Sequence, residues 1–244
     1  MKLPKIYKPK NFYQLERFGK NNDGGYLVGK KSILNSKYLI SFGINDDWSF
    51  EKDILMKFNN VKVFSYDDVL GFYYLIKLFI LNSFRFFLST TNLKTFILSF
   101  VKIFEYGLIK SKINFKKKKI SYKDTLKITK NFECIFFKID IEGSEYRILE
   151  DLIKIQKKIN IIVIEFHNID LHKDKIIKFI RNLKLELTHI HPNNFSIPDK
   201  NGNPTVVEFT FERYPVIIGK KNKLPNPKDM KCNPNKPDYI LRFV

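Results

Sequence analysis

The segment CIFFKIDIEGSEYRIL, residues 134–149, runs from mostly apolar residues into a cluster of acids and one glycine. A continuous apolar run is typical of a strand that is covered on both faces, as in a parallel sheet. Burying a charge is costly unless a partner compensates it. We therefore expect a buried strand here, with Asp140, Glu142 and Glu145 lining a polar cleft at its carboxyl end.

The segments on either side alternate between strand and helix patterns. Residues 37–43 and 61–68 have strand patterns, and residues 49–58 between them carry apolar side chains at helical spacing, with Ser49 as the expected N-cap. The second half of the chain predicts strands at 134–139 and 159–166, helices at 148–153 and 173–184, and a closing antiparallel pair at 185–191 and 205–213. This alternation indicates an α/β fold with a mostly parallel sheet.

Length and composition are those of one domain. The chain has 244 residues, 44% of them hydrophobic and 15% aromatic, which suffices for a single core over residues 1–244. The N-terminus has no apolar signal core, and no apolar stretch reaches the roughly 18 residues of a membrane span. The two cysteines, Cys134 and Cys232, suggest neither a disulfide framework nor a metal-ligand cluster. These features predict a cytoplasmic protein, free or at the inner face of the membrane.

The net charge of +19 would suit nucleic acid or an anionic membrane. Lysine, isoleucine, asparagine and phenylalanine are abundant throughout the chain, however, so we interpret most of this charge as ordinary solvated surface. The run KKKK at residues 116–119 could hold the phosphates of a nucleotide diphosphate, although a solvated loop is the simpler interpretation. A nucleic-acid partner is therefore not favoured.

Residues 70–119 break the alternation. They are rich in Phe, Leu and Ile, contain Glu105 as the only acid, and are expected to be helical. Three interpretations fit: helices that cap the site or the core, an interface of a homo-oligomer, or a basic amphipathic surface on a membrane. Lys77 and Arg85 argue against a spanning helix. The tail at residues 214–244 is rich in Pro and Asn and is expected to be irregular.

Polar residues follow several of the predicted strands. In an open parallel sheet, ligands bind beyond the carboxyl ends of the strands. The residues expected at that edge are Gly43, Asn45, Asp67, Asp140, Glu142, Glu165 and His167. Neither a G-x-G-x-x-G dinucleotide fingerprint nor a phosphate-binding G-x-x-x-x-G-K-[ST] loop is present. A single-glycine turn with an acid after the second strand suits an adenosyl ligand without phosphates, with Asp67 accepting hydrogen bonds from both ribose hydroxyls.

The segment FFKIDIEGSEYRILEDL resembles the K-I-D-x-E-G-x-E motif of the FkbM family of S-adenosylmethionine-dependent methyltransferases. Further segments are also similar to such enzymes: ERFGKNNDGGYLV, YLISFGINDDWSFEKD, IEFHN, and HIHPNN with VVEFTF. The resemblance therefore covers roughly residues 16–68 and 124–212. It implies a class I Rossmann-like fold of strand order 3-2-1-4-5-7-6 and methyl transfer to a hydroxyl, often of a sugar. The usual D-x-G-x-G glycine pattern is missing, and residues 70–119 lie outside the resemblance.

The resemblance also implies a set of cofactor contacts. The glycine-rich NNDGGYLV at residues 21–28 would close over S-adenosylmethionine, although the same residues suit an ordinary hairpin turn. The expected cofactor-binding residues are Asp23, Gly24, Tyr26, Phe42, Gly43, Ile44, Asn45, Asp67 and Asp140.

Methyl transfer to a hydroxyl needs a base or a metal, because a sugar hydroxyl is a poor nucleophile. His167 is our first candidate for the base, since it follows the strand next to the one that ends at Asp140. His191 is the second candidate. A histidine that is merely hydrogen-bonded at a strand end remains an alternative for both. His189 is expected to be structural and His172 to lie on the surface.

The acids have two interpretations. Asp140 and Glu142 could hold a metal or the hydroxyls of the substrate, or one of them could cap the following helix. Asp140, Glu165 and Asn168 could bind a divalent cation such as Mg²⁺ through oxygen ligands, which would lower the pKa of the acceptor hydroxyl.

The sequence therefore predicts an S-adenosylmethionine-dependent O-methyltransferase. The expected acceptor is a hydroxyl of a sugar, either nucleotide-activated or part of a surface glycan such as capsule or lipopolysaccharide. Two alternatives remain: an RNA or DNA methyltransferase, and a non-enzymatic basic protein bound peripherally to a membrane. The first lacks a [DN]-P-P-[YF] motif to support it.

Overall fold

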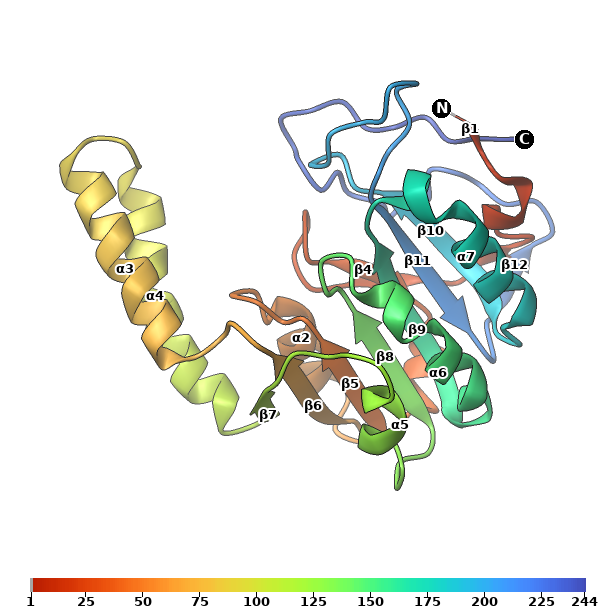
Figure 1. The fold of residues 1–244 in the computed structure, drawn as a ribbon, viewed down its shortest axis with the longest axis horizontal. Helices are drawn as coiled ribbons and strands as arrows, with labels where there is room; N and C mark the ends of the chain where they lie inside the picture. The colour runs from red at the N-terminus through yellow and green to blue at the C-terminus, as the bar shows by residue number, and fades with distance from the viewer. Residues whose placement is uncertain (1) are drawn as a thin grey trace.

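A seven-stranded sheet forms the centre of the computed structural model, which describes residues 2–244 (Figure 1). Its strands are β5 (Tyr38–Phe42), β6 (Lys62–Asp67), β7 (Asn114–Lys117), β8 (Ile135–Ile139), β9 (Ile159–Phe166), β10 (Glu186–Pro192) and β11 (Val207–Glu212). Their spatial order is β10-β11-β9-β8-β5-β6-β7. Numbered along the chain, this is the expected order 3-2-1-4-5-7-6 read from the other edge. Strand β11 is antiparallel to both of its neighbours, β10 and β9, and the other strand pairs of this sheet are parallel.

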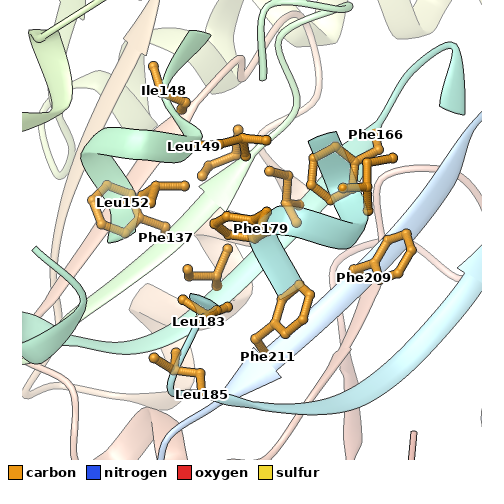
Figure 2. Close-up of a cluster of buried hydrophobic side chains, with 14 of the residues drawn as sticks. Phe137, Ile148, Leu149, Leu152, Phe166, Phe179, Leu183, Leu185, Phe209 and Phe211 are labelled. Atoms are coloured by element: carbon orange, nitrogen blue, oxygen red, sulfur yellow. The ribbon is translucent and has the colours of Figure 1, made fainter. Parts of the chain in front are cut away.

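Helices cover both faces of the sheet. The α-helices are α1 (Lys30–Leu34), α2 (Ser49–Lys57), α3 (Phe72–Phe87), α4 (Leu93–Lys110), α5 (Asp124–Ile128), α6 (Leu149–Lys154) and α7 (Ile169–Asn182). Phe137 of β8 packs in one core cluster with residues of α6 and α7, part of which is drawn in Figure 2. Its neighbour Phe136 packs in a second cluster with residues of α1 and α2. Successive side chains of a strand point to opposite faces, which explains why β8 is buried at every position and apolar at all of them except Lys138.

The chain termini lie together at one end of the molecule (Figure 1). Strand β1 (Lys2–Leu3) pairs with β13 (Arg242–Phe243), and β2 (Phe12–Tyr13) pairs with β12 (Ile217–Gly219). Strands β3 (Glu16–Phe18) and β4 (Tyr26–Val28) form the hairpin that the glycine-rich segment predicted. The 3-10 helices are η1 (Lys5–Tyr7), η2 (Glu145–Arg147) and η3 (Gln156–Lys158). The C-terminal tail is thus largely irregular but pinned to the body by two short strands.

Helices α3 and α4 form a hairpin that projects away from the sheet (Figure 1). Its base joins the core through Leu75, Tyr106 and Ile109, and its distal part stands clear of the body. Within residues 2–244, no helix is both long enough and apolar enough to cross a membrane. The hairpin leads into the edge strand β7, which sequence patterns missed because lysines follow Phe115. Lysines on an edge strand discourage pairing with other chains.

The sequence predicted the central elements with small errors at their ends. The strand expected at 159–166 is β9, whereas the helix expected at 173–184 begins earlier, as α7. The N-cap prediction for Ser49 was wrong: Ser49 is the first residue of α2. The Asp47 carboxylate accepts a hydrogen bond from the Ser49 backbone N–H at 3.1 Å and so takes over the role of the cap.

Removal of the Phe137 side chain tests the two-sided core. Phe137 is fully buried, so Phe137→Ala should lower the free energy of unfolding by about 3–5 kcal/mol through lost contacts and a cavity. Phe87→Ala is the matched control, because Phe87 is 82% exposed on the hairpin and should change stability by less than about 0.5 kcal/mol. Urea denaturation measures both variants. Equal effects of the two would contradict the assignment of the core.

Candidate functional site

A cleft of about 1000 Å³ lies at the carboxyl ends of β5, β6, β8 and β9. Its lining includes Gly43, Asp67, Asp140, Glu165 and His167, which come from these four strand ends. Sites for small molecules commonly enclose about 300–1000 Å³. The cleft is therefore large enough for a nucleoside-sized ligand together with a second reactant, and it is where the sequence predicted a site.

Gly43 and Asp140 meet at the centre of the rim. Gly43 has φ +75°, and a Cβ atom at this position would lie 1.6 Å from the carbonyl oxygen of Asp140. Only glycine fits such a contact. The Gly43 N–H donates to the Tyr66 carbonyl at 3.0 Å, and the ammonium of Lys138 donates to the Gly43 carbonyl. The ends of β5, β6 and β8 are thus joined at one glycine.

The carboxylate of Asp67 ties the loops on either side of it. One oxygen accepts hydrogen bonds from two N–H groups of the turn after β5, and the other accepts from two N–H groups of the loop after β6. The donors and distances are Ile44 (3.1 Å), Asn45 (2.8 Å), Val69 (2.8 Å) and Leu70 (2.7 Å). A carboxylate has about four hydrogen-bond acceptor sites. The four amides occupy those of Asp67, which we had assigned to ribose hydroxyls. The neighbouring Asp68 is exposed and lines the cleft.

Glu145 organises the loop that follows β8. The residue is fully buried, and its Oε1 accepts hydrogen bonds from the N–H groups of Ile141 and Gly143 at 3.1 Å each. The same oxygen lies 3.1 Å from Nδ1 of His167. The predicted acid at this position is therefore a structural and electrostatic support, and it fixes the orientation of a histidine at the cleft.

The other ring nitrogen of His167 faces carboxylates. Nε2 lies 3.4 Å from Glu142, 3.8 Å from Glu165 and 4.0 Å from Asp140, measured to the nearest carboxylate oxygen. Burial alone would lower the pKa of His167, but the hydrogen bond and charge of Glu145, with Asp140 and Glu142, raise it above its usual value. His167 is thus a strengthened base whose Nε2 lies at the cleft.

The inner wall of the cleft carries more carboxylates than cations. Burial, followed by the charges of neighbouring acids, raises the pKa of Asp23 to about 6 and that of Glu165 well above its usual value. Asp23 is open to the water of the cleft, yet protein atoms surround it closely enough to weaken its solvation. Burial would lower the pKa of Lys138, but Asp140 and other nearby carboxylates raise it. This wall favours a cationic ligand or one with many hydrogen-bond donors.

A group of possible metal ligands lies on this wall. One ligand atom each from Asp140, Glu165 and His167 lies within 4.8 Å of the others. Asn168, the third ligand expected from sequence, is the N-cap of α7 in a left-handed conformation, and it does not belong to the lining of the cleft. The ammonium of Lys138 is 3.7 Å from Asp140, so an ion pair already compensates part of the charge.

The remaining predicted residues divide between the cleft and the core. Gly24, Ile44 and Asn45 line the cleft, as does Glu142, whose side chain is largely exposed at its mouth. Tyr26 is buried behind the wall, with its hydroxyl 3.4 Å from Asp140.

Phe42 and three histidines do not reach the cleft lining. The ring of Phe42 is fully buried against Tyr66. His191 is buried next to the C-terminal tail, His189 pairs with Asp229 at 2.8 Å, and His172 lies against the ring of Tyr146.

Sequence reasoning missed two polar residues of this wall. Lys138 is buried in β8, and a lysine inside an otherwise apolar strand was the available signal. Asn193 donates to Glu165 at 3.0 Å and to Asp23 at 3.3 Å. It comes to the wall only because β10 and β11 fold back beside β9, which no local pattern could reveal.

Comparison with known families gives a match to the middle part of the chain. Residues 80–188 match the family model described as Methyltransferase FkbM domain. Residues 80–188 are thus similar to an FkbM methyltransferase domain. This finding confirms the resemblance seen in the K-I-D-x-E-G-x-E segment and supports an S-adenosylmethionine-dependent methyltransferase. It also corrects the expected extent, because the matched range includes most of the α3–α4 hairpin, which we had placed outside the resemblance.

Comparison with solved structures gives distant matches to other methyltransferases. A fibrillarin pre-rRNA processing protein from Methanococcus jannaschii matches with a TM-score of 0.40 and 9% identity, covering 74% of this chain and 68% of that one. A putative RNA methyltransferase from Pyrococcus horikoshii matches with a TM-score of 0.41 and 12% identity, covering 76% of each chain. TrmK from M. capricolum, bound to S-adenosyl-homocysteine, matches with a TM-score of 0.37 and 12% identity, covering 77% of this chain and 70% of that one. A comparison with curated proteins found no match.

The raised pKa of Glu165 predicts how the stability of this protein depends on pH. A carboxyl whose pKa is higher in the folded than in the unfolded state stabilises the fold below the unfolded value, and this contribution disappears as pH rises through the folded value. The ligand-free protein should therefore lose thermal stability from about pH 4.5 upward. Glu165→Gln should flatten this dependence and raise the melting temperature at about pH 8.

Glu142→Gln is the matched control, because the Glu142 side chain is 83% exposed and should leave the profile unchanged. Melting curves over this pH range measure all three proteins. A profile of Glu165→Gln that parallels the wild type would contradict a neutral Glu165 in the folded state.

Proposed function

We propose that this protein is an O-methyltransferase that acts on a sugar hydroxyl. The observation that carries the proposal is the pair formed by buried Glu145 and His167, with Nε2 of the imidazole at the cleft beside Asp140. When bound, S-adenosylmethionine supplies a methyl group on a positively charged sulfur. The protein has to attract that cation, align the acceptor hydroxyl and remove its proton.

The wall of carboxylates suits the positive donor. Asp23 and Asp140 provide negative charge near the glycine turn, and Asp68 offers a free carboxylate for the ribose hydroxyls. Asp67 contributes indirectly, because it holds the turn after β5 in place. Removing Asp67 should therefore weaken donor binding by loosening the turn, whereas removing Asp68 should weaken it through a lost contact.

His167 is the proposed general base. Its Nδ1 is held by Glu145, so its Nε2 can accept the proton of a hydroxyl bound between Asp140, Glu142 and Glu165. The resulting imidazolium is stabilised by Glu145 in the same way that a carboxylate supports the histidine of a catalytic triad. Carboxylates also accept hydrogen bonds from several hydroxyls at once, which fits a sugar acceptor.

The charge of the cleft argues against a nucleic-acid acceptor. The lining contains twice as many acids as lysines: Asp23, Asp46, Asp47, Asp67, Asp68, Asp140, Glu142 and Glu165 against Lys20, Lys118, Lys119 and Lys138. Phosphate backbones bind to surfaces with the opposite balance. The net charge of +19 therefore belongs to other parts of the surface than the mouth of the site.

A divalent cation such as Mg²⁺ is an alternative source of activation at the same wall. Asp140 and Glu165 would supply carboxylate ligands, and the cation would lower the pKa of a bound hydroxyl. His167 belongs to the same group of atoms, so one imidazole nitrogen would serve either as ligand or as base. Sensitivity of the reaction to a chelator distinguishes activation by a cation at this wall from activation by His167 as a base.

Methylation assays test the proposed acceptor and base together. The purified protein with S-adenosylmethionine should add one CH₂ unit to a member of a panel of sugar nucleotides and glycans, detected by mass spectrometry. His167→Gln should reduce the rate by about 10²–10⁴-fold while calorimetry shows unchanged binding of the donor, because the imidazole acts on the acceptor.

His172→Gln is the control, since His172 lies against Tyr146 and outside the cleft. No binding of S-adenosylmethionine at millimolar concentration would contradict the proposal. A fully active His167→Gln variant would contradict the role of the base, and loss of wild-type activity with chelator would favour the metal.

The hairpin of α3 and α4 supports a further part of the proposal, contact with an anionic membrane. Apolar side chains are exposed on the sides of both helices that face away from their partner, including Ile80, Phe84 and Phe87 on α3 and Ile97 and Phe104 on α4. Apolar side chains on the outward sides of both helices favour a partner that covers both sides of the pair. A second copy of the chain would cover one side, whereas a lipid phase surrounds the whole hairpin.

The charges of the hairpin fit the same partner. Residues 72–110 contain the cations Lys77, Arg85, Lys94, Lys102 and Lys110 and a single acid, Glu105, which pairs with Lys52 at 3.2 Å. Long basic side chains can lay their stems on apolar surface while their charges reach lipid headgroups. A membrane-bound enzyme would meet glycans that are assembled on lipid carriers.

Vesicle flotation tests the membrane contact. The wild type should float with vesicles containing anionic phosphatidylglycerol and much less with pure phosphatidylcholine, and high salt should weaken binding. The double variant Phe84→Ser with Phe87→Ser should remain unbound. Ile197→Ser is the matched control, because Ile197 is 83% exposed but lies outside the hairpin. A lipid-independent dimer that the double variant disrupts would contradict this proposal in favour of self-association.

A further inference from the structure

A second group of ligand-type side chains lies beneath the cleft, apart from the proposed base. His191 of β10, Glu208 of β11 and Cys232 of the C-terminal tail are all buried. The Cys232 Sγ atom is 3.8 Å from Nδ1 of His191 and 3.5 Å from Oε1 of Glu208, and Nδ1 is 3.7 Å from Oε2 of Glu208. We propose that these three residues bind a zinc ion.

The separations are those of three corners of a metal tetrahedron. Zinc lies about 2.3 Å from sulfur and about 2.0–2.2 Å from nitrogen or oxygen, so tetrahedral ligands are roughly 3.3–3.6 Å apart. The Sγ–Oε1 separation of 3.5 Å falls within this range, whereas the separations from Nδ1 to Sγ (3.8 Å) and to Oε2 (3.7 Å) exceed it by a few tenths of an ångström. The two oxygens of Glu208 thus face one partner each, and either of them could serve as the ligand atom. The contact of 3.7 Å between the imidazole and the carboxylate is too long for a hydrogen bond, whose usual length is about 2.7–3.2 Å. The contacts that join these three residues are thus the long ones of the thiol, 3.8 Å to His191 and 3.5 Å to Glu208.

The fold presents the ligands in advance. His191 and Glu208 are directly paired across the antiparallel strands β10 and β11. Asn194 holds the tail beside them, because its Oδ1 accepts from the Asn233 N–H at 2.6 Å and its Nδ2 donates to the Asn233 carbonyl at 3.0 Å. Cys232 therefore reaches the strand pair although it is 24 residues from Glu208 in the sequence.

The surroundings of His191 are those of a metal ligand. Its second ring nitrogen, Nε2, lies 3.4 Å from the Asp238 carboxylate. A carboxylate behind a ligating histidine orients the ring and holds a proton on the far nitrogen, so that a metal binding at Nδ1 has to displace only the proton of that nitrogen. Burial, and then the nearby charge of Glu208, raise the pKa of the Cys232 thiol to about 12. A zinc ion would reverse this effect, because its binding releases the thiol proton to solvent and leaves a metal-bound thiolate.

The proposed ion would keep one coordination position toward the cleft. Cys232 lines the cleft near Asp23, so the fourth position would take a water molecule or an oxygen atom from a ligand. Three protein ligands and one open position are the pattern of catalytic rather than structural zinc sites. A role in binding the acceptor hydroxyl rests on the proposed function, whereas the metal site itself does not.

Metal analysis of the full chain tests the site. Protein purified without a polyhistidine tag should contain one zinc ion per chain, and replacement by Co²⁺ should produce the charge-transfer absorption of a cobalt thiolate. Cys232→Ser should lose both signals. Cys134→Ser is the matched control, because Cys134 is the other cysteine and lies at the opposite end of the sheet, before β8; this variant should keep both.

Further variants keep the test decisive. Glu208→Gln should weaken zinc binding at least tenfold, while Glu165→Gln should retain it, because Glu165 belongs to the other group. Circular dichroism identifies any variant that fails to fold. In that case the wild type is tested instead: zinc is removed and then added back, and the melting temperature is measured in each state. Zinc-free wild type that gains neither metal nor stability would overturn the site. A cobalt signal without methyl transfer would sustain the site and contradict the proposed function.

Discussion

The close contact between Gly43 and the Asp140 carbonyl is the constraint on which the arrangement of the cleft depends. It requires a residue without a side chain and with positive φ, and it brings the ends of β5 and β8 within van der Waals contact. The Lys138 ammonium and the Asp67 carboxylate then secure the turn from two sides. Because the backbone approaches so closely, the carboxylates that follow each strand are gathered around one hollow rather than dispersed along the sheet edge.

Gathering acids in this way has an electrostatic cost that the protein offsets unevenly. Asp67 and Glu145 are compensated by backbone N–H groups and serve as supports. Burial, and then the charges of neighbouring acids, raise the pKa values of Glu165 and Asp23, which share the side-chain amide of Asn193 as a donor. Groups that are poorly compensated in the free protein are those that gain most from a cationic ligand. The same carboxylates, which repel one another across the cleft, therefore favour a positively charged methyl donor.

Histidines on neighbouring segments acquire different roles from their partners. His167 has a buried carboxylate behind Nδ1 and the carboxylates of the cleft wall in front of Nε2, which suits proton transfer. His191 has a carboxylate behind it and a thiol with a second carboxylate in front, which suits a metal. His189 has Asp229 at 2.8 Å in a closed environment, which suits packing. The residue type is the same in all three cases, and the environment determines the chemistry.

The sequence by itself determined the buried strands of the sheet, though not the edge strand β7, because mostly apolar runs such as residues 135–139 and 159–166 are typical of strands covered on both faces. It also indicated Gly43, Asp140 and His167, since ligands of parallel sheets gather at strand ends. It could not reveal that Asp67 is occupied by amides, that Asn193 reaches Glu165, or that Cys232 meets His191 and Glu208. The contacts of Asn193 and Cys232 join residues that are far apart in the chain, so the folded path of β10, β11 and the tail decided them. The amides on Asp67 come from its own loop and from the turn after β5, which the pairing of β5 with β6 brings beside it.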